Sequence, residues 1–283
     1  MIYRIIKKLL NLSIGSLRPP HLSINVSQIN YGGILRGKRV LITGGSRGIG
    51  LAIAKKFLSE GAVVLVTGRN LEKLQEIAHK VNNKNFYYML HDVNDINSYD
   101  AFLQSVAEKI GGIDILVSNA GISLHEGFIE NVTSEGFDKT YLTNFKANYF
   151  LAKSYIKTVV GKQNGNILFV TSKDGAVCND IPYGLTKASM NSLVGALSCR
   201  YYAQGIRVNA IAPGVTLTDM TKSYAQKEDG NMYSNNYAGR NFLPLEVAEV
   251  ACFIVSDAAN CVSGQILFTD AGDHLKSNVQ LYR

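Results

Sequence analysis

The 283-residue sequence has no apolar run long enough to span a bilayer, and it contains no internal repeats or low-complexity linkers. Its four cysteines form no CxxC pair, and neither they nor the five histidines fall at metal-ligand spacing. We therefore expect free thiols in a reducing compartment and no metal site. Hydrophobic residues at 46% and charged residues at 18% indicate a globular chain with a sizeable core.

Acidic residues are absent from the first 38 positions, although the chain as a whole contains 22 Asp and Glu. The basic residues in this stretch are Arg4, Lys7, Lys8, Arg18, Arg36 and Lys38. The formal net charge of +7 is therefore concentrated there, and the rest of the chain is close to neutral. This distribution argues against a nucleic-acid-binding protein. We predict a basic N-terminal extension, residues 1–37, and one domain, residues 38–283.

The first 12 residues would form an amphipathic helix. Its apolar face would carry Ile2, Ile5, Ile6, Leu9 and Leu12, and its basic face Arg4, Lys7, Lys8 and Asn11. Such a helix could contact a membrane peripherally, pack on the protein or on a neighbouring subunit, or serve as a targeting segment. The sequence does not distinguish these three roles. The apolar part is too short and interrupted to favour secretion. We expect a cytoplasmic protein, peripheral at a membrane if the first alternative holds.

Beyond the extension, short apolar runs alternate with longer amphipathic stretches. The runs predict strands at 39–43, 62–67, 85–91, 113–118, 166–171, 207–212 and 265–269, and the stretches predict helices at 48–59, 71–81, 96–110, 135–160, 182–203 and 245–256. Most runs are continuously apolar, as in strands buried on both faces. We predict a single-domain α/β fold of the Rossmann type, with a doubly wound, seven-stranded parallel sheet and helices on both faces.

A glycine-rich segment, TGGSRGIG at residues 43–50, joins the first predicted strand to the first helix. Glycine permits a tight turn and lets the backbone approach a pyrophosphate, while the helix N-terminus offers N–H groups to that anion. The position between a strand and a helix makes the segment informative. The predicted cofactor contacts from it are Gly44, Ser46, Arg47, Gly48, Ile49 and Gly50.

No carboxylate follows the second predicted strand, where an acid would bind the ribose hydroxyl of NAD. The chain has Arg69 and Asn70 there, and Arg47 in the glycine segment is a second cation nearby. An arginine can donate two hydrogen bonds at once to a phosphate. We therefore predict NADP(H) as the cofactor; the alternative is that both arginines are solvated surface charges.

Tyr183 and Lys187 form a YxxxK pattern, although two other Tyr–Lys pairs in the sequence have the same spacing. Context distinguishes this pair, because Tyr183 follows Pro182 at an expected helix start and residues i and i+4 share a helix face. Ser172 follows the fifth predicted strand. Since ligands bind beyond the carboxyl ends of parallel strands, Ser172 is expected at the same edge as the glycine segment.

In this order, the motifs resemble the short-chain dehydrogenase/reductase family over residues 38–272, in particular its 3-oxoacyl-[acyl-carrier-protein] reductase branch. Besides the segments above, the resemblance rests on Asp92-Val93, Ser118-Asn119-Ala120-Gly121, Asn144, the NAIAPG segment 209–214 with Thr218, and Ser263-Gly264-Gln265. Each motif alone is weak, but the ordered set is specific. The resemblance implies an oxidoreductase that interconverts a carbonyl and an alcohol by hydride transfer.

The resemblance also implies a catalytic set of Asn144, Ser172, Tyr183 and Lys187. Tyr183 would transfer the substrate proton, and Lys187 would lower its pKa from ~10 and hold the nicotinamide ribose. Ser172 would hydrogen-bond the substrate oxygen, and Asn144 would hold a proton-relaying water. The further cofactor contacts would be Asn70, Asp92, Val93, Asn119, Ala120, Gly121, Pro213, Gly214, Val215 and Thr218.

The substrate, a small-molecule or carrier-bound carbonyl compound, is less defined. Residues 219–237, which form the substrate lid in this family, are rich in Tyr and Asn. Such a lid suits a keto-sugar or nucleotide-sugar better than a bare acyl chain, unless it is only a solvated loop. A non-catalytic NADP-binding scaffold is the rival function, disfavoured by the complete catalytic set. Apolar residues along 135–160 and 182–203 match the helices that pair across subunits in this family, which implies a homodimer or homotetramer.

Overall fold

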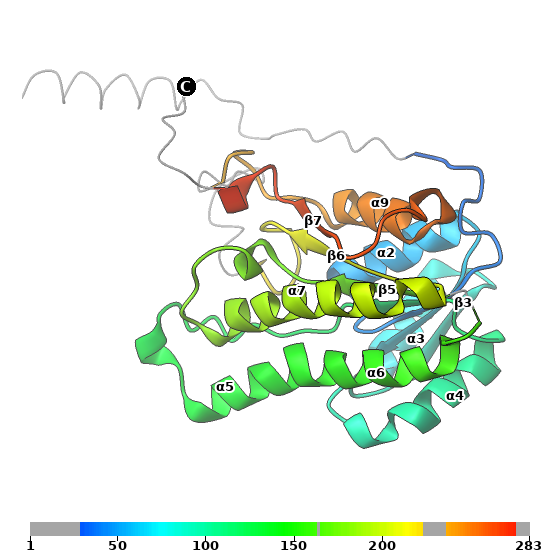
Figure 1. The fold of residues 1–283 in the computed structure, drawn as a ribbon, viewed down its shortest axis with the longest axis horizontal. Helices are drawn as coiled ribbons and strands as arrows, with labels where there is room; N and C mark the ends of the chain where they lie inside the picture. The colour runs from blue at the N-terminus through cyan, green and yellow to red at the C-terminus, as the bar shows by residue number, and fades with distance from the viewer. Residues whose placement is uncertain (1–28, 163–164, 223–235, 276–283) are drawn as a thin grey trace, which may run out of the picture.

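The strands of the protein form one parallel sheet, as seen in a computed structural model that describes residues 29–162, 165–222 and 236–275. The strand order is β3-β2-β1-β4-β5-β6-β7, and Figure 1 labels β3, β5, β6 and β7 in this sheet. The strands are β1 (Arg39–Ile42), β2 (Val63–Gly68), β3 (Phe86–Leu90), β4 (Ile115–Ser118), β5 (Gly165–Val170), β6 (Ile206–Pro213) and β7 (Ile266–Thr269). The predicted Rossmann-type fold with a seven-stranded parallel sheet is confirmed.

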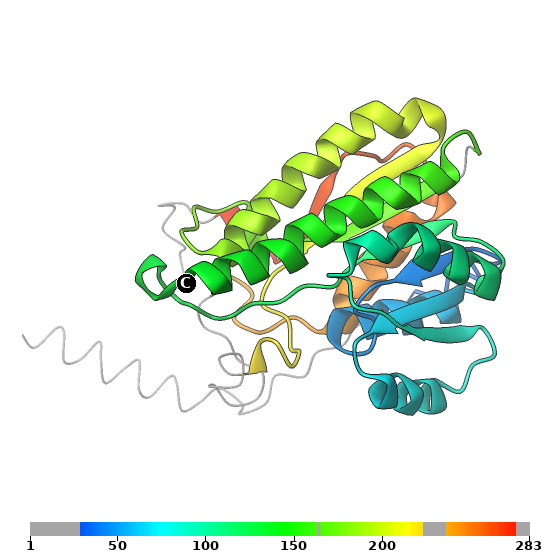
Figure 2. The same cartoon turned by 90° about the horizontal axis from the view of Figure 1, so that it is seen from below.

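Helices cover both faces of the sheet, and each face has its own hydrophobic cluster. One face carries α2 (Gly48–Ser59), α3 (Leu71–Val81) and α9 (Pro244–Val255), and the other carries α4 (Tyr99–Ile110), α6 (Ala147–Val159) and α7 (Pro182–Tyr201). Figure 2 shows α6 and α7 running side by side over the second face. No helix in the described ranges is long and apolar enough to cross a bilayer.

The strand order places a crevice at one edge of the sheet. The chain passes from β1 outward to β2 and β3, returns to β4 beside β1, and then continues in the opposite direction to β7. Because all strands are parallel, their carboxyl ends lie at the same edge, and the connections diverge on either side of β1 and β4. Such a topological switch point is where open α/β sheets bind ligands.

The predicted helix at 135–160 differs from the structure. It consists of α5 (Ser134–Tyr141), a π-helical turn η3 (Leu142–Lys146) and α6. Asn148, in the first turn of α6, donates through its side-chain amide to two backbone oxygens of the π turn, those of Thr143 and Asn144, at 3.1 and 2.8 Å. The Asn148 side chain thus satisfies carbonyls at the turn, and π turns of this kind frequently occur at functional sites.

Residues 29–37, the described part of the predicted extension, pack against the body of the protein. Leu35 is fully buried, and its N–H donates to the Glu60 backbone oxygen at 3.1 Å. Tyr31 and Ile34 are partly buried against the cluster that α2, α3 and α9 share. The predicted amphipathic helix at 1–12 lies outside the described residues.

A buried ion cluster, defined by Lys56, Glu60 and Glu249, holds this segment in place. The Lys56 Nζ lies 3.0 Å from Glu60 and 3.1 Å from Glu249, and it donates to the backbone oxygen of Ile29 at 2.5 Å. Burial disfavours the charge on Lys56, but the hydrogen bonds to the two carboxylates outweigh it and raise the pKa of the lysine. The cluster therefore links α2, α9 and the N-terminal segment through one ammonium group.

Candidate active site

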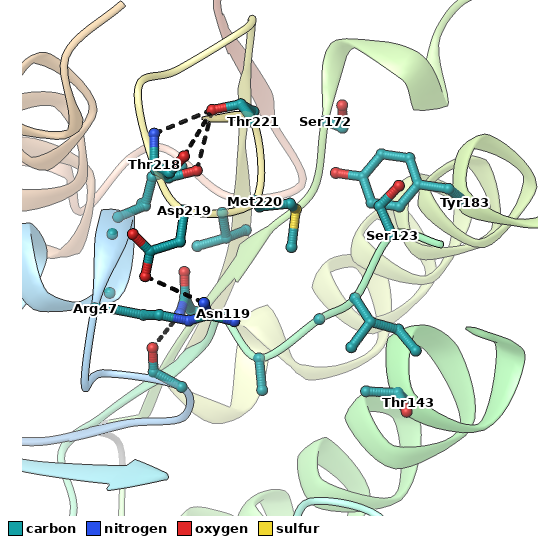
Figure 3. A pocket seen from close by; sticks show the side chains of 18 of the residues that line it. Arg47, Asn119, Ser123, Thr143, Ser172, Tyr183, Thr218, Asp219, Met220 and Thr221 are labelled. Atoms are coloured by element: carbon teal, nitrogen blue, oxygen red, sulfur yellow. Dashed lines mark hydrogen bonds and ion pairs between the residues drawn. The ribbon is translucent and has the colours of Figure 1, made fainter. Parts of the chain in front are cut away.

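A cavity of about 740 Å³ opens at the carboxyl edge of the sheet, at the switch point. Its lining comes from the loop between β1 and α2 and from the segments that follow β2, β3, β4, β5 and β6. Figure 3 shows Arg47, Thr218 and Asp219 on one side of the cavity and Ser172 and Tyr183 on the other. Every residue predicted to contact the cofactor lines this one cavity.

The glycine segment is shaped by close backbone contacts. Gly44 has a φ of +64°, in the left-handed region that favours glycine. A Cβ at Gly50 would lie 2.5 Å from the Asn119 side-chain nitrogen and 2.6 Å from the Gly44 oxygen. The same Asn119 nitrogen donates to the backbone oxygens of Thr43 and Gly44, at 2.9 and 3.0 Å. The end of β4 thus holds the loop in the narrow turn that the sequence predicts.

Several observations fit a dinucleotide in this cavity. Arg47, the N-cap of α2, makes no side-chain cap hydrogen bond, so no side chain at that position competes with an anion for the first amides of the helix. Three buried polar atoms in the lining, Thr67 Oγ1, His91 Nε2 and Asn94 Oδ1, have no hydrogen-bond partner in the described ranges. Buried polar groups normally have partners, so these atoms indicate a polar ligand.

The end of the cavity beside β2 is cationic. Arg47, Arg69 and Lys73 line it, and all three come from loops or helix starts next to the glycine segment. Asp219 lies among them, with its carboxylate 3.2 Å from Arg47 and 3.9 Å from Lys73. Lys73 was missed in the sequence, although its place in the first turn of the helix that follows Arg69-Asn70 would have indicated it.

Lys187 and Tyr183 lie on successive turns of α7, which begins at Pro182. The Lys187 Nζ is 5.5 Å from the centre of the Tyr183 ring and donates to the Val170 backbone oxygen at 3.0 Å. Burial lowers the pKa of Lys187 to about 8, against a weaker opposing effect of the Asp174 charge. A positive charge is therefore held beside the tyrosine in a place with little water.

Ser172 follows β5 and caps the short 3₁₀ turn η4 (Lys173–Gly175). Its Oγ accepts a hydrogen bond from the Asp174 N–H at 3.1 Å. A hydroxyl that accepts one bond still has its own proton to donate. Ser172 is therefore oriented by the backbone while its donor is available toward the cavity.

Asn144 is nearly fully buried and lies behind the cavity wall rather than in its lining. Its side chain accepts from the Ile122 N–H and donates to the Ile122 oxygen, both at 2.8 Å. A Cβ on Gly121 would lie 3.2 Å from Asn144 Oδ1 and 3.7 Å from Lys187 Nζ, so the three residues are neighbours. In the structure Asn144 fixes the loop after β4; its water-holding role stays a prediction.

The substrate side of the cavity contains polar residues that sequence reasoning missed. Ser123 and His125 follow β4, and Lys173 and Asp174 lie in η4; all four line the cavity. They stand in irregular loops, where no periodicity marks the residues that face inward. Of the predicted lid, Asp219, Met220 and Thr221 line the cavity, and residues 223–235 lie outside the described part.

No group of three His, Cys, Asp or Glu residues that could hold a metal ion occurs in the ranges that the structure describes. All four cysteines are free thiols, and only Cys252 is buried.

Comparison with known proteins places the chain in a family. Residues 44–274 match the family model described as Enoyl-(Acyl carrier protein) reductase. The 3-oxoacyl-[acyl-carrier-protein] reductase FabG of Haemophilus influenzae is 32% identical over 85% of this chain and 100% of its own length. The chain belongs to the short-chain dehydrogenase/reductase family. The resemblance inferred from the ordered motifs is thus confirmed.

Other members of this oxidoreductase family are similar to the same extent. A 3alpha-hydroxysteroid dehydrogenase of Mediterraneibacter gnavus is 32% identical over 84% of this chain and 97% of its own length. Among solved structures, ElxO with NADP bound superposes with a TM-score of 0.79 at 30% identity, covering 85% of this chain and all of ElxO. The 3-ketoacyl-(acyl-carrier-protein) reductase of Brucella melitensis, complexed with NADH, has a TM-score of 0.77 at 28% identity, covering 85% and 99%.

Proposed function

We propose that this short-chain dehydrogenase/reductase is an NADP(H)-dependent enzyme that interconverts a carbonyl compound and an alcohol. The observation that supports this best is that Ser172, Tyr183 and Lys187 line the same cavity as the glycine segment. When bound, the nicotinamide cofactor would supply or accept the hydride. The residues of the glycine segment and the ends of β2, β3 and β4 would hold it.

Tyr183 is the proposed proton donor to the carbonyl oxygen. The Lys187 ammonium lies close enough to stabilise the phenolate that remains once the proton has left. Ser172, whose Oγ is oriented by the Asp174 N–H, would donate to the same oxygen as negative charge develops there. In the reverse reaction Tyr183 would take the alcohol proton.

A preference for NADP(H) over NAD(H) is proposed from charge. Three cations, Arg47, Arg69 and Lys73, surround the end of the cavity where a ribose 2′-phosphate would lie, and Asp219 pairs with two of them. A phosphate there would compete with Asp219 for these cations. We expect Arg69→Asp to weaken NADPH binding at least tenfold and to leave NADH binding nearly unchanged, as measured by fluorescence titration. Equal affinities of the wild type for both cofactors would contradict the proposal.

The polar lining of the substrate side favours a polar carbonyl substrate. Ser123, His125 and Asp174 offer hydrogen bonds and charge, beside apolar contacts from Ile122. A keto-sugar or nucleotide-sugar would form hydrogen bonds with such groups, whereas a 3-oxoacyl chain would place methylene groups against them. The names of the relatives refer to acyl-carrier-protein-linked and steroid substrates, so both substrate classes belong in the test.

The deciding experiment follows NADPH oxidation with a panel of 3-oxoacyl thioesters, simple ketones, steroids and keto-sugars. We expect turnover with at least one class, and higher kcat/KM for the polar ketones. NADPH binding without turnover of any class would favour the non-catalytic scaffold instead.

We also propose a homodimer or homotetramer. Phe137 on α5, Tyr149 and Phe150 on α6, and Leu185 on α7 are each at least 36% exposed. These exposed apolar side chains lie on neighbouring helices, and a group of this kind is typical of an interface between subunits. Sedimentation at micromolar concentration is expected to show the oligomer, and Phe150→Lys to shift it toward monomer. A monomeric wild type would contradict the proposal.

The N-terminal extension is proposed to be an accessory, because all of the proposed cofactor and catalytic residues lie downstream of it, and its described part, residues 29–37, does not line the cavity. Deletion of residues 1–28 should retain NADPH binding and turnover. Co-sedimentation with anionic vesicles, lost on deletion and weakened by salt, would support peripheral membrane contact. A lower melting temperature without vesicle binding in either form would support packing on the protein.

A further inference from the structure

Lys173, the residue after Ser172, forms an ion pair with a residue from the far end of the chain. Its Nζ lies 3.0 Å from Asp273 Oδ2 and 3.4 Å from Asp174 Oδ1. Asp273 lies in the 3₁₀ turn η8 (Asp273–Leu275) and is only 2% exposed. The two carboxylates raise the pKa of Lys173 against the opposing effect of burial, so its charge is retained.

The turn η8 is itself firmly held. The Asp270 carboxylate, nearly fully buried, accepts from the N–H groups of Gly272 and His274 at 3.0 and 2.8 Å. The His274 ring lies 2.8 Å from the same carboxylate through Nδ1 and stacks on Phe268, with 3.7 Å between ring centres. Asp273 therefore presents its carboxylate from a rigid support.

The opposite side of η4 lies against α7. A Cβ on Gly175 would lie 2.7 Å from the Lys187 carbonyl carbon and 2.9 Å from the Ala188 nitrogen. The Asn191 side chain donates to the Gly175 oxygen at 3.2 Å. The turn that Ser172 caps is thus held between α7 and η8.

We propose that Lys173 and Asp273 are positioning residues for Ser172, a role that rests on the proposed function of that serine. The pair fixes η4, and η4 fixes the Asp174 N–H that donates to Ser172 Oγ. Without the pair, η4 loses its ionic contact with η8, while its contacts with α7 remain. The Asp174 N–H then shifts, and Ser172 loses the hydrogen bond that directs its proton toward the substrate.

The first test measures amide hydrogen exchange by NMR in the full-length protein, without any substrate. In Lys173→Met and in Asp273→Asn, the amides of Asp174 and Gly175 are expected to exchange at least tenfold faster than in the wild type. Lys173→Arg, which keeps the charge, should restore protection to within threefold. Lys157→Met removes an exposed lysine from another Lys–Asp pair and serves as the control that leaves η4 unchanged. Unchanged exchange in both test variants overturns the proposal.

The second test uses the best substrate of the panel. Lys173→Met and Asp273→Asn should each lower kcat about tenfold, with KM and the NADPH Kd within twofold of the wild type, and the double variant should be no worse than either. Full kcat despite faster exchange would overturn the positioning role. A raised KM with unchanged kcat and exchange would make Lys173 a substrate ligand instead. If the wild type turns over no substrate, the proposed function fails, and the exchange result still decides whether the pair holds η4.

Discussion

Replacement of Lys187 by Met should make the protein more stable at neutral pH while abolishing its activity. Burial lowers the pKa of this lysine from 10.5 to about 8. The folded state therefore binds fewer protons than the unfolded state between these two values. The free energy of unfolding of the wild type therefore rises with pH through this window. Below the window, the buried charge of Lys187 lowers the free energy of unfolding by its full amount.

The size of the effect follows from the shift. At pH 7 the lysine is mostly protonated in both states, so its burial costs about 3 kcal/mol at 1.36 kcal/mol per pKa unit. Near pH 10 the folded-state lysine is neutral, and the cost falls to about 1 kcal/mol. Met cannot donate to the Val170 oxygen, which costs about 1 kcal/mol at either pH. Lys187→Met should thus be about 2 kcal/mol more stable than the wild type at pH 7 and about equal to it near pH 10.

The assay is urea unfolding of the cofactor-free protein at both pH values, for the wild type, Lys187→Met and the control Lys157→Met. Other groups titrate in this range, but they are common to all three proteins and cancel in the differences. Lys157 is exposed, so its replacement should change stability by a small, pH-independent amount. Parallel stability curves for wild type and Lys187→Met would show that burial does not penalise this charge. NADPH oxidation by Lys187→Met should be lost.

Three further substitutions test the site and the fold. Tyr183→Phe removes the proposed proton donor and should lower kcat at least a hundredfold with NADPH affinity within threefold; retention of a tenth of the activity would assign the proton to another group. Gly50→Ala places a methyl group against the glycine segment and should weaken NADPH binding at least tenfold by calorimetry, whereas normal binding would mean that the turn adapts. Lys56→Met leaves two buried carboxylates without their cation and should cost about 3–5 kcal/mol in urea unfolding, against under about 1 kcal/mol for the exposed control Lys80→Met. Equal losses would mean that the cluster is not effectively buried.

The sheet could be predicted from the sequence because parallel strands buried on both faces are continuously apolar. β5 and β6 are buried along their whole length, and each of their ends lies within one residue of the predicted runs. The bounds of α2 and α3 agree with the predicted helices as well. The π turn at Leu142–Lys146 could not be predicted. The Asn148 side chain, which donates to two carbonyls of this turn, also accepts a hydrogen bond from the Ser118 hydroxyl at the end of β4, and local periodicity does not record that contact.

The cofactor part of the site was predictable because its residues follow strand ends in a fixed order. The substrate part was not, since Ser123 and His125 lie in an irregular loop. Lys173 and Asp273 are adjacent in space but a hundred residues apart in the chain, and neither stands in a motif. Ion pairs of this kind appear only when the fold has brought the two segments together.

The buried ion cluster bears on where the folding unit of this protein begins. The family match starts at residue 44, and the first strand at Arg39. A chain shortened to either point would lose the Ile29 carbonyl that binds Lys56, and the N–H groups of Tyr31 and Gly33 that bind the Glu60 carboxylate. Those charges would stay buried at the end of α2, whose first turn lines the cavity. A tag or fusion partner should therefore join the chain upstream of residue 29. Attachment there keeps the hydrogen bonds that residues 29–33 make with Lys56 and Glu60 at the end of α2.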